Sequence, residues 1–228
     1  MPSVPARQPT VPDTRAELSL EVHPSPAPVI TLVRHGQTEW SLDGRHTSVT
    51  DIPLTTDGEK EARALRAPLA RTDFDLVVVS PMHRARATAD LAGLGSRAEV
   101  WEDLREWNYG SYEGIATPEI RSSRPDWNIF EHGAPGGEST EDVGERADRV
   151  IARFRSSGAR RIAAFAHSHI LRVIGARWID LHPSGGIRLV LSTASISELG
   201  YERETPALTR WNDTGHLWNG SAPPATAS

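Results

Sequence analysis

The chain has 228 residues, a formal net charge of −5 and no cysteine. Its length fits one large domain or two small ones, and its acidic balance does not favour nonspecific binding to nucleic acid. The lack of cysteine excludes a disulfide framework, a cysteine nucleophile and thiolate metal sites. No apolar run is long enough for a membrane span, and the N-terminus lacks the apolar core of a secretory signal. We therefore expect a cytoplasmic protein without nucleic-acid or membrane partners.

The two ends of the chain differ in composition from the middle. Residues 1–27 are rich in Pro, Ala, Ser and charge without apolar periodicity, and residues 219–228 are similar. Such segments have too little apolar surface to offset the entropy lost on ordering. We predict a disordered extension over 1–27, a folded domain over 28–218 and a disordered tail over 219–228.

Strand and helix patterns alternate along the middle of the chain. Short apolar or β-branched runs predict buried strands; they cover residues 29–33, 76–79, 98–101 and 162–166, with one or two later strands within 189–201 and 207–211. Helical periodicity follows several of these runs. This alternation predicts a three-layer α/β/α architecture with a mainly parallel central sheet and helices on both faces.

Several helix starts have recognisable capping signals. Thr56 with Glu59 three residues later forms a potential capping box. Ser80 followed by Pro81 is typical of an N-cap and first helical position, which places Arg84 in the first turn of that helix.

The segments between these elements are less regular. Ser139 can cap a further helix, with an apolar face formed by later residues of that segment. We expect a polar loop over 41–53 and a short polar segment over 115–138 that acts as a lid.

Polar side chains follow four of the predicted strands. Arg34 and His35 end the first, Arg84 follows the second, His167 ends the fourth, and Glu106 lies in the loop after the third. Ligands of open α/β sheets bind beyond the carboxyl ends of the strands, where these side chains could converge. Guanidinium groups match phosphate oxygens, and a neutral imidazole is a nucleophile near pH 7. Each residue alone fits a solvated or packed position, but their shared placement favours a phosphate pocket with a nucleophile and an acid.

Six motifs in order resemble the histidine phosphatase superfamily, which has the phosphoglycerate-mutase-like fold. They cover residues 34–40, 54–58, 80–89, 104–114, 136–139 and 166–169. The resemblance spans nearly all of residues 28–200. It implies that His35 is the nucleophile and that Arg34, Arg84 and His167 surround the phosphoryl oxygens. It also implies that Glu106 protonates the leaving oxygen and then acts as base for water, without cofactor or metal.

The sequence departs from the family pattern at two places. Ser41 follows Trp40 where many members have Asn; its hydroxyl can still donate to a phosphoryl oxygen. Ser168 and His169 stand where many members have two glycines, and His169 either reaches the pocket rim or is packed or solvated.

Within the superfamily, the motifs most resemble the sedoheptulose-bisphosphatase-like sugar phosphatases and related bacterial acid phosphatases. That resemblance implies substrate contacts from four further residues: Thr47, Ser48, Tyr109 and Arg172. Without the resemblance, Thr47 and Ser48 fit ordinary loop positions, and Arg172 fits an exposed helix position.

The leading hypothesis is a metal-independent phosphatase that hydrolyses small phosphomonoesters, with sugar phosphates as candidates, through a phosphohistidine. The nearest alternative is a phosphoglycerate mutase. Two further alternatives are a metal-dependent hydrolase built on His167 and His169 and a catalytically inactive binding module; the intact nucleophile, arginines and acid disfavour the latter. The specific substrate depends on the loops over 43–52 and 107–138, and the sequence indicates no oligomeric state.

Overall fold

The computed structural model describes residues 27–218, which include a six-stranded sheet in the order β3-β2-β4-β1-β5-β6. The strands are β1 (Val29–Arg34), β2 (Leu76–Val79), β3 (Ala98–Val100), β4 (Arg161–Ala166), β5 (Ile196–Glu202) and β6 (Thr205–Asp213). β1 to β4 pair in parallel, whereas β5 and β6 add antiparallel strands at one edge. The predicted mainly parallel sheet is confirmed. The predicted extension and tail lie outside the described residues, apart from residue 27.

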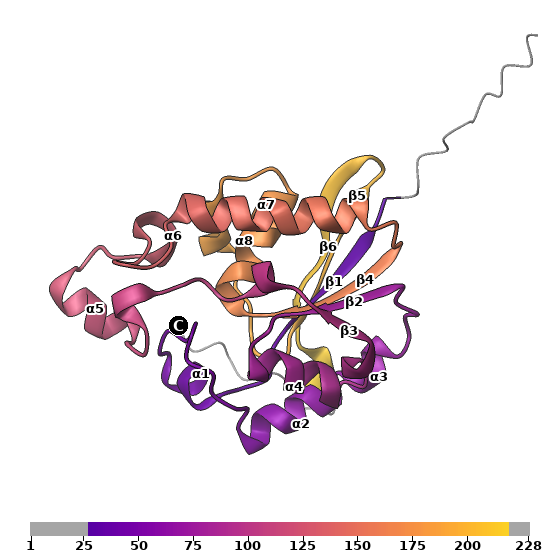
Figure 1. Cartoon of the computed structure of the whole chain (residues 1–228), viewed down its shortest axis with the longest axis horizontal. Helices are drawn as coiled ribbons and strands as arrows, with labels where there is room; N and C mark the ends of the chain where they lie inside the picture. Colours follow the sequence, from indigo (N-terminus) through magenta and orange to yellow (C-terminus); the bar gives the residue numbers. More distant parts are fainter. Residues whose placement is uncertain (1–26, 219–228) are drawn as a thin grey trace, which may run out of the picture.

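Helices cover both faces of this sheet (Figure 1). α2 (Thr56–Ala64), α3 (Arg66–Leu69) and α4 (His83–Leu91) lie on one side, and α7 (Thr140–Ser156) and α8 (Ser168–Trp178) lie on the other. Side chains alternate between the two faces along each strand. In β2, Val78 joins the core beneath α7 and α8, whereas Val77 and Val79 join the core beneath α3 and α4. The three-layer architecture follows from this alternation.

Smaller helices gather at the end of the molecule that holds α1 (Glu39–Asp43), α5 (Thr117–Ser123) and α6 (Ile129–His132) (Figure 1). Short 3₁₀ helices occur at η1 (Gly95–Arg97), η2 (Glu102–Leu104), η3 (Gly110–Tyr112), η4 (Pro183–Arg188) and η5 (Gly215–Leu217). α1 occupies the start of the predicted polar loop. The predicted lid over 115–138 contains α5 and α6, and its Ile120, Trp127 and Phe130 are buried in the core shared with α7 and α8.

Two predicted helix starts are wrong in detail. The N-cap of α2 is Thr55 rather than Thr56, because the Thr55 hydroxyl accepts from the Gly58 N–H at 3.0 Å. α4 begins at His83, after an N-cap without a side-chain bond. Ser80 is fully buried, and its hydroxyl lies 2.7 Å from Nε2 of the buried His167. The local pattern predicted that the Ser80 hydroxyl caps the helix, but this hydroxyl instead bonds His167, which is distant in sequence.

Two later elements can be compared in the same way. Ser139 caps α7 in a capping box with Asp142, as its position predicts. β5 begins at Ile196, so only the second part of the predicted run over 189–201 is strand. The preceding residues form a loop, and the Leu191 carbonyl in it accepts a bond from Arg34 Nη1 at 2.6 Å.

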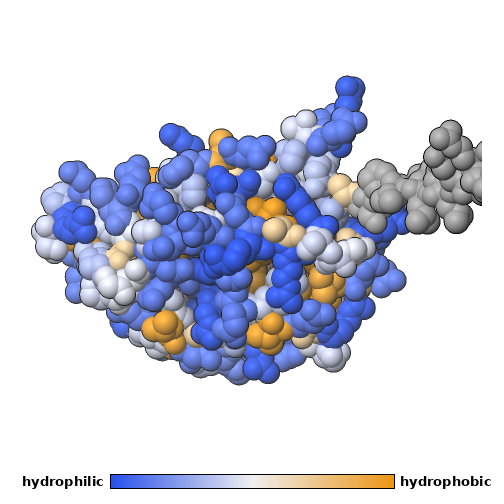
Figure 2. Space-filling model, turned by 45° about the horizontal axis from the view of Figure 1, so that its top comes forward, coloured by the Kyte–Doolittle hydropathy of each residue, from blue (hydrophilic) through white to orange (hydrophobic). Residues whose placement is uncertain are grey.

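The surface in Figure 2 is mainly hydrophilic, with small separate hydrophobic areas. The large apolar side chains lie mostly in the two cores on either side of the sheet. Within the described range, no helix combines the length and apolar character needed to cross a membrane.

Candidate active site

His35 follows the last residue of β1 and is 6% exposed. Its Nδ1 lies 2.7 Å from the Gly36 carbonyl oxygen, which can only accept a hydrogen bond. Nδ1 therefore carries the proton, and Nε2 keeps a lone pair. Burial, together with the charges of Arg84 and Arg34, lowers the pKa of His35 well below its usual range. The imidazole is thus neutral and ready to act as a nucleophile through Nε2.

Gly36 and Gly58 let two backbone segments touch beside this histidine. A Cβ on Gly36 would collide with the Gly58 carbonyl, and a Cβ on Gly58 would collide with the Gln37 carbonyl. The Gly36 N–H also donates to the Thr88 hydroxyl of α4 at 3.0 Å. The start of α2 makes this close approach, which fixes the backbone that carries His35.

His167 lies at the end of β4, with its ring centroid 5.2 Å from that of His35. Nε of Arg84 donates to Nδ1 of His167 at 3.1 Å, so the His167 proton is on Nε2, which donates to the Ser80 hydroxyl. Burial, with the charge of Arg84 as the next cause, lowers the pKa of His167 well below its usual range. His167 is therefore neutral, and protein groups engage both of its nitrogens.

Arg84 is fully buried beside these histidines. Beyond its bond to His167, its terminal nitrogens donate to the carbonyls of Thr47, Ser48 and Thr50 at 3.1–3.2 Å. The guanidinium thus brings a positive charge to the centre of the site and holds the loop after α1 against it.

Glu106 is 5% exposed and connects its loop to the N-terminus of α8. Its Oε1 accepts from the N–H groups of Trp107 at 3.0 Å and Ile170 at 2.9 Å, and its Oε2 accepts from the N–H of His169 at 3.0 Å. The first N–H groups of a helix have no partner within the helix, so a carboxylate suits this position.

His35 and Glu106 line the same cavity, which has a volume of about 230 Å³. It is lined by Arg34, His35, Thr38, Ser41, Gly44, Arg45, His46, Thr47, Glu106, Tyr109, Thr117, Ser168 and His169. Nη2 of Arg34 has no hydrogen-bond partner among residues 27–218, and it is not among the buried atoms, so it can donate to a ligand. Arg84 and His167 are not among the lining residues, although the ring of His167 lies beside that of His35, with 5.2 Å between centroids. The arrangement can receive an anion beside a nucleophile and a carboxyl group.

Residues 30–214 match the model of the histidine phosphatase superfamily, branch 1. The chain belongs to the histidine phosphatase superfamily. It is accordingly a phosphoric monoester hydrolase with the phosphoglycerate-mutase-like fold, as the motif resemblance predicts.

Its relatives include characterised phosphatases. An acid phosphatase of Mycobacterium tuberculosis is 40% identical over 190 residues, which cover 82% of this chain and 93% of the relative. The sedoheptulose 1,7-bisphosphatase of Saccharomyces cerevisiae is 40% identical over 189 residues, covering 69% of this chain and 70% of the relative. A solved structure of an open reading frame product of Mycobacterium tuberculosis has a TM-score of 0.79 at 40% identity, covering 83% of this chain and 99% of that one.

The residues predicted to bind substrate in this histidine phosphatase lie in different places. Ser41 lines the cavity, but its hydroxyl is part of the α1 cap, where it accepts from the Thr38 N–H at 2.8 Å. Thr47 and Tyr109 also line the cavity. Ser48 is 5% exposed and lines a neighbouring cavity of about 270 Å³ instead.

Arg172 of this histidine phosphatase lines a third cavity, of about 170 Å³, which shares His46, Thr117 and His169 with the first. Its guanidinium lies 4.4 Å above the Phe130 ring and donates to carbonyls of the loop at η4. Burial lowers the pKa of Arg172 to about 10, so it stays cationic near pH 7.

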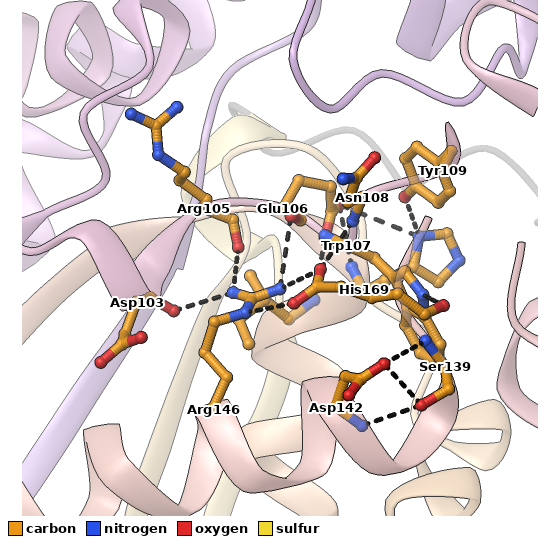
Figure 3. Close-up of polar contacts among 12 residues, drawn as sticks. Asp103, Arg105, Glu106, Trp107, Asn108, Tyr109, Ser139, Asp142, Arg146 and His169 are labelled. Atoms are coloured by element: carbon orange, nitrogen blue, oxygen red, sulfur yellow. Dashed lines mark hydrogen bonds and ion pairs between the residues drawn. The ribbon is translucent and has the colours of Figure 1, made fainter. Parts of the chain in front are cut away.

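The sequence left open whether His169 reaches the pocket rim or is packed or solvated. In the structure of this histidine phosphatase, His169 lines the cavity. Its Nδ1 lies 2.6 Å from the Tyr109 hydroxyl (Figure 3). Burial, with the charge of Glu106, raises the pKa of Tyr109 well above its usual range, so the phenol is protonated. Because a phenol is a stronger acid than a neutral imidazole, the hydroxyl is the donor and Nδ1 the acceptor in this contact.

The motif analysis missed His46 and Thr117, whose side chains lie 3.2 Å apart in the cavity wall. Each is a single polar residue, His46 in a loop and Thr117 at the first position of α5, without a spacing that marks a site.

Proposed function

We propose that this histidine phosphatase hydrolyses small phosphomonoesters, with sugar phosphates as candidate substrates, through a phosphohistidine at Nε2 of His35. The observation that carries the proposal is the bond from Nδ1 of His35 to the Gly36 carbonyl, which leaves the Nε2 lone pair in a neutral imidazole. This nitrogen shares a cavity with Arg34 and Glu106.

The reaction has two displacements at phosphorus and starts with Glu106 as the carboxylic acid. Nε2 of His35 attacks the phosphoryl group, and the bond from phosphorus to the ester oxygen breaks as Glu106 delivers its proton to that oxygen and becomes a carboxylate. Water then gives a proton to the Glu106 carboxylate and attacks the phosphohistidine. The bond between nitrogen and phosphorus breaks, phosphate leaves, and His35 and Glu106 return to their starting states.

The cations of the site stabilise the charge of the transferred phosphoryl group. Arg34 offers a free Nη2 to the phosphoryl oxygens. Arg84 brings a buried positive charge next to these histidines, because its Nε donates to Nδ1 of His167, whose ring lies beside that of His35. Phosphoryl transfer depends mainly on such positioning and charge stabilisation.

Metal-independent chemistry is part of the proposal. A metal bound by His167 and His169 would have to displace existing bonds, because Arg84 and Ser80 engage both nitrogens of His167 and Tyr109 engages Nδ1 of His169. In the described part of the chain, no three His, Asp or Glu side chains are placed to hold a metal ion.

Sugar phosphates are supported by the character of the cavity wall. Beyond the phosphate end it presents hydroxyl groups and neutral imidazoles, such as Thr117, His46 and His169. These groups can donate to and accept from the hydroxyls of a sugar, and the bisphosphatase of yeast supports the same class. The proposal includes a cytoplasmic location, where small phosphorylated metabolites are made.

Rapid quenching during turnover tests the intermediate. We expect an acid-labile, base-stable phosphoryl label on His35, and His35→Ala should abolish both label and turnover while the fold is retained. A label on His167 instead would overturn the assignment of the nucleophile.

A further inference from the structure

The loop that carries Glu106 has no regular secondary structure between η2 and η3, over residues 105–109. Its peptide groups therefore cannot be held by a helix or a sheet, and other groups must fix them. The position of this backbone matters because a general acid must lie within about 3 Å of the atom that it protonates.

Arg146 supplies much of this support from α7, as Figure 3 shows. Its Nη1 donates to the carbonyls of Asp103 at 2.9 Å and Arg105 at 2.6 Å, and its Nη2 donates to the carbonyl of Glu106 at 3.4 Å. Arg146 is 7% exposed. One buried guanidinium thus binds the backbone of the acid residue and of two residues before it.

Glu138 holds the other side of the same loop. It forms a two-point ion pair with Arg146, with both nitrogen–oxygen distances at 2.8 Å. Its Oε2 also accepts from the Asn108 N–H at 2.8 Å, and its carbonyl accepts from Trp107 Nε1 at 2.9 Å. The planar fork of arginine matches a carboxylate in this way, whereas a lysine ammonium is a point charge.

The side chain of Glu106 has two of its three N–H donors in another element, His169 and Ile170 at the start of α8, and the third donor is the Trp107 N–H of the loop. The backbone of Glu106 therefore depends on α7, and its carboxylate depends on α8. A change at Arg146 would move the loop relative to the carboxylate's partners and to His35, which lies across the cavity.

We propose that Arg146, through its pair with Glu138, is a positioning residue for proton transfer by Glu106. The inference rests on the proposed role of Glu106 as proton donor to the leaving oxygen. Its consequence is specific: loss of Arg146 should slow the departure of basic leaving groups more than that of leaving groups that need no proton.

The test compares single-turnover phosphorylation rates for a sugar phosphate and for p-nitrophenyl phosphate. Arg146→Met should slow the sugar phosphate reaction by about 10²-fold, the size expected for a displaced catalytic group, and should slow the nitrophenyl reaction much less. Arg149→Met is the matched control, because Arg149 lies on the same helix and pairs with the exposed Asp103 carboxylate at 3.1 Å rather than with the loop backbone. It should leave both rates unchanged.

Arg146→Lys keeps the charge and guards against a folding defect in the methionine variant. We expect the thermal midpoint of Arg146→Lys to be close to that of the wild type. The lysine variant should still slow the sugar phosphate reaction more than the nitrophenyl reaction. Equal losses for both substrates, or a wild-type ratio in the lysine variant, would overturn the positioning role.

Glu106→Gln, measured beside these variants, distinguishes a failure of the positioning role of Arg146 from a failure of the proposed proton donor, Glu106. A selective loss in Glu106→Gln without one in Arg146→Met would overturn the inference alone. Equal losses in Glu106→Gln would overturn the proposed proton donor, and the inference with it.

Discussion

The hydroxyl of Tyr109 donates to Nδ1 of His169 across 2.6 Å, between a loop and the first turn of α8. Because Nδ1 accepts, the proton of His169 is on Nε2. That nitrogen has no partner among residues 27–218 and is not among the buried atoms, and His169 lines the cavity. Tyr109 thereby determines that His169 presents a donor to the cavity.

Tyr109→Phe should remove this control of the His169 tautomer. We expect kcat/KM for a sugar phosphate to fall about five- to tenfold, the worth of one hydrogen bond, mainly through a higher KM. Steady-state kinetics on a sugar phosphate measure the effect. Tyr112→Phe is the control, because the Tyr112 hydroxyl makes just a long contact of 3.5 Å with Arg124. An equal loss in both variants would contradict the tautomer argument.

Acid should destabilise the protein through its buried histidines. Burial lowers the pKa of His46 to about 4, and the pKa values of His35, His167 and His169 are also depressed. Below the ordinary histidine range near 6.5, the unfolded chain takes up protons that the folded chain does not. Stability therefore falls as pH decreases, by up to about 1.4 kcal/mol per pH unit for each such histidine.

His46→Gln tests this linkage at one site. Between pH 6 and pH 4.5, it should reduce the slope of the unfolding free energy against pH by about one proton, as measured by urea denaturation. The same change at the exposed His182 is the control. An unchanged slope in His46→Gln would mean that unfolding of the protein is not linked to protonation of His46.

The sequence predicted the elements whose signals are local. The strands β1, β2 and β4 are apolar runs. Of the residues that the strand-end rule expected to converge, Arg34, His35 and Glu106 line one cavity, whereas Arg84 and His167 are not among its lining residues. Ser80 was misassigned because a capping pattern does not show that His167, distant in sequence, engages its hydroxyl.

His46 and Thr117 were missed for a related reason. An isolated bridge pairs Arg45 with Ala116, and the His46 N–H donates to the Ile115 carbonyl at 3.1 Å. This contact between distant loops puts both side chains into the cavity wall. No periodicity within either loop indicates it, because tertiary packing determines which loop residues meet.

Removal of divalent metal should leave turnover intact. In the proposed mechanism His35 supplies the nucleophile and Arg34 and Arg84 supply positive charge, so we expect full activity in EDTA. Vanadate, which mimics five-coordinate phosphorus, should inhibit competitively. Initial rates on p-nitrophenyl phosphate measure both effects. Activity that disappears in EDTA and returns with a divalent ion would favour the metal-dependent alternative.

With 3-phosphoglycerate, the enzyme should release phosphate rather than form 2-phosphoglycerate. A mutase must exclude water while its phosphoenzyme waits for an acceptor, and closure of a cover over the site achieves this. The segment over 115–138 is anchored instead, because Trp127 and Phe130 are buried in the core shared with α7 and α8, and the Phe130 carbonyl accepts from the Thr140 hydroxyl of α7 at 3.0 Å. Phosphorus NMR should show inorganic phosphate as the product, with no dependence on 2,3-bisphosphoglycerate. Interconversion of the two phosphoglycerates with little free phosphate would identify a mutase.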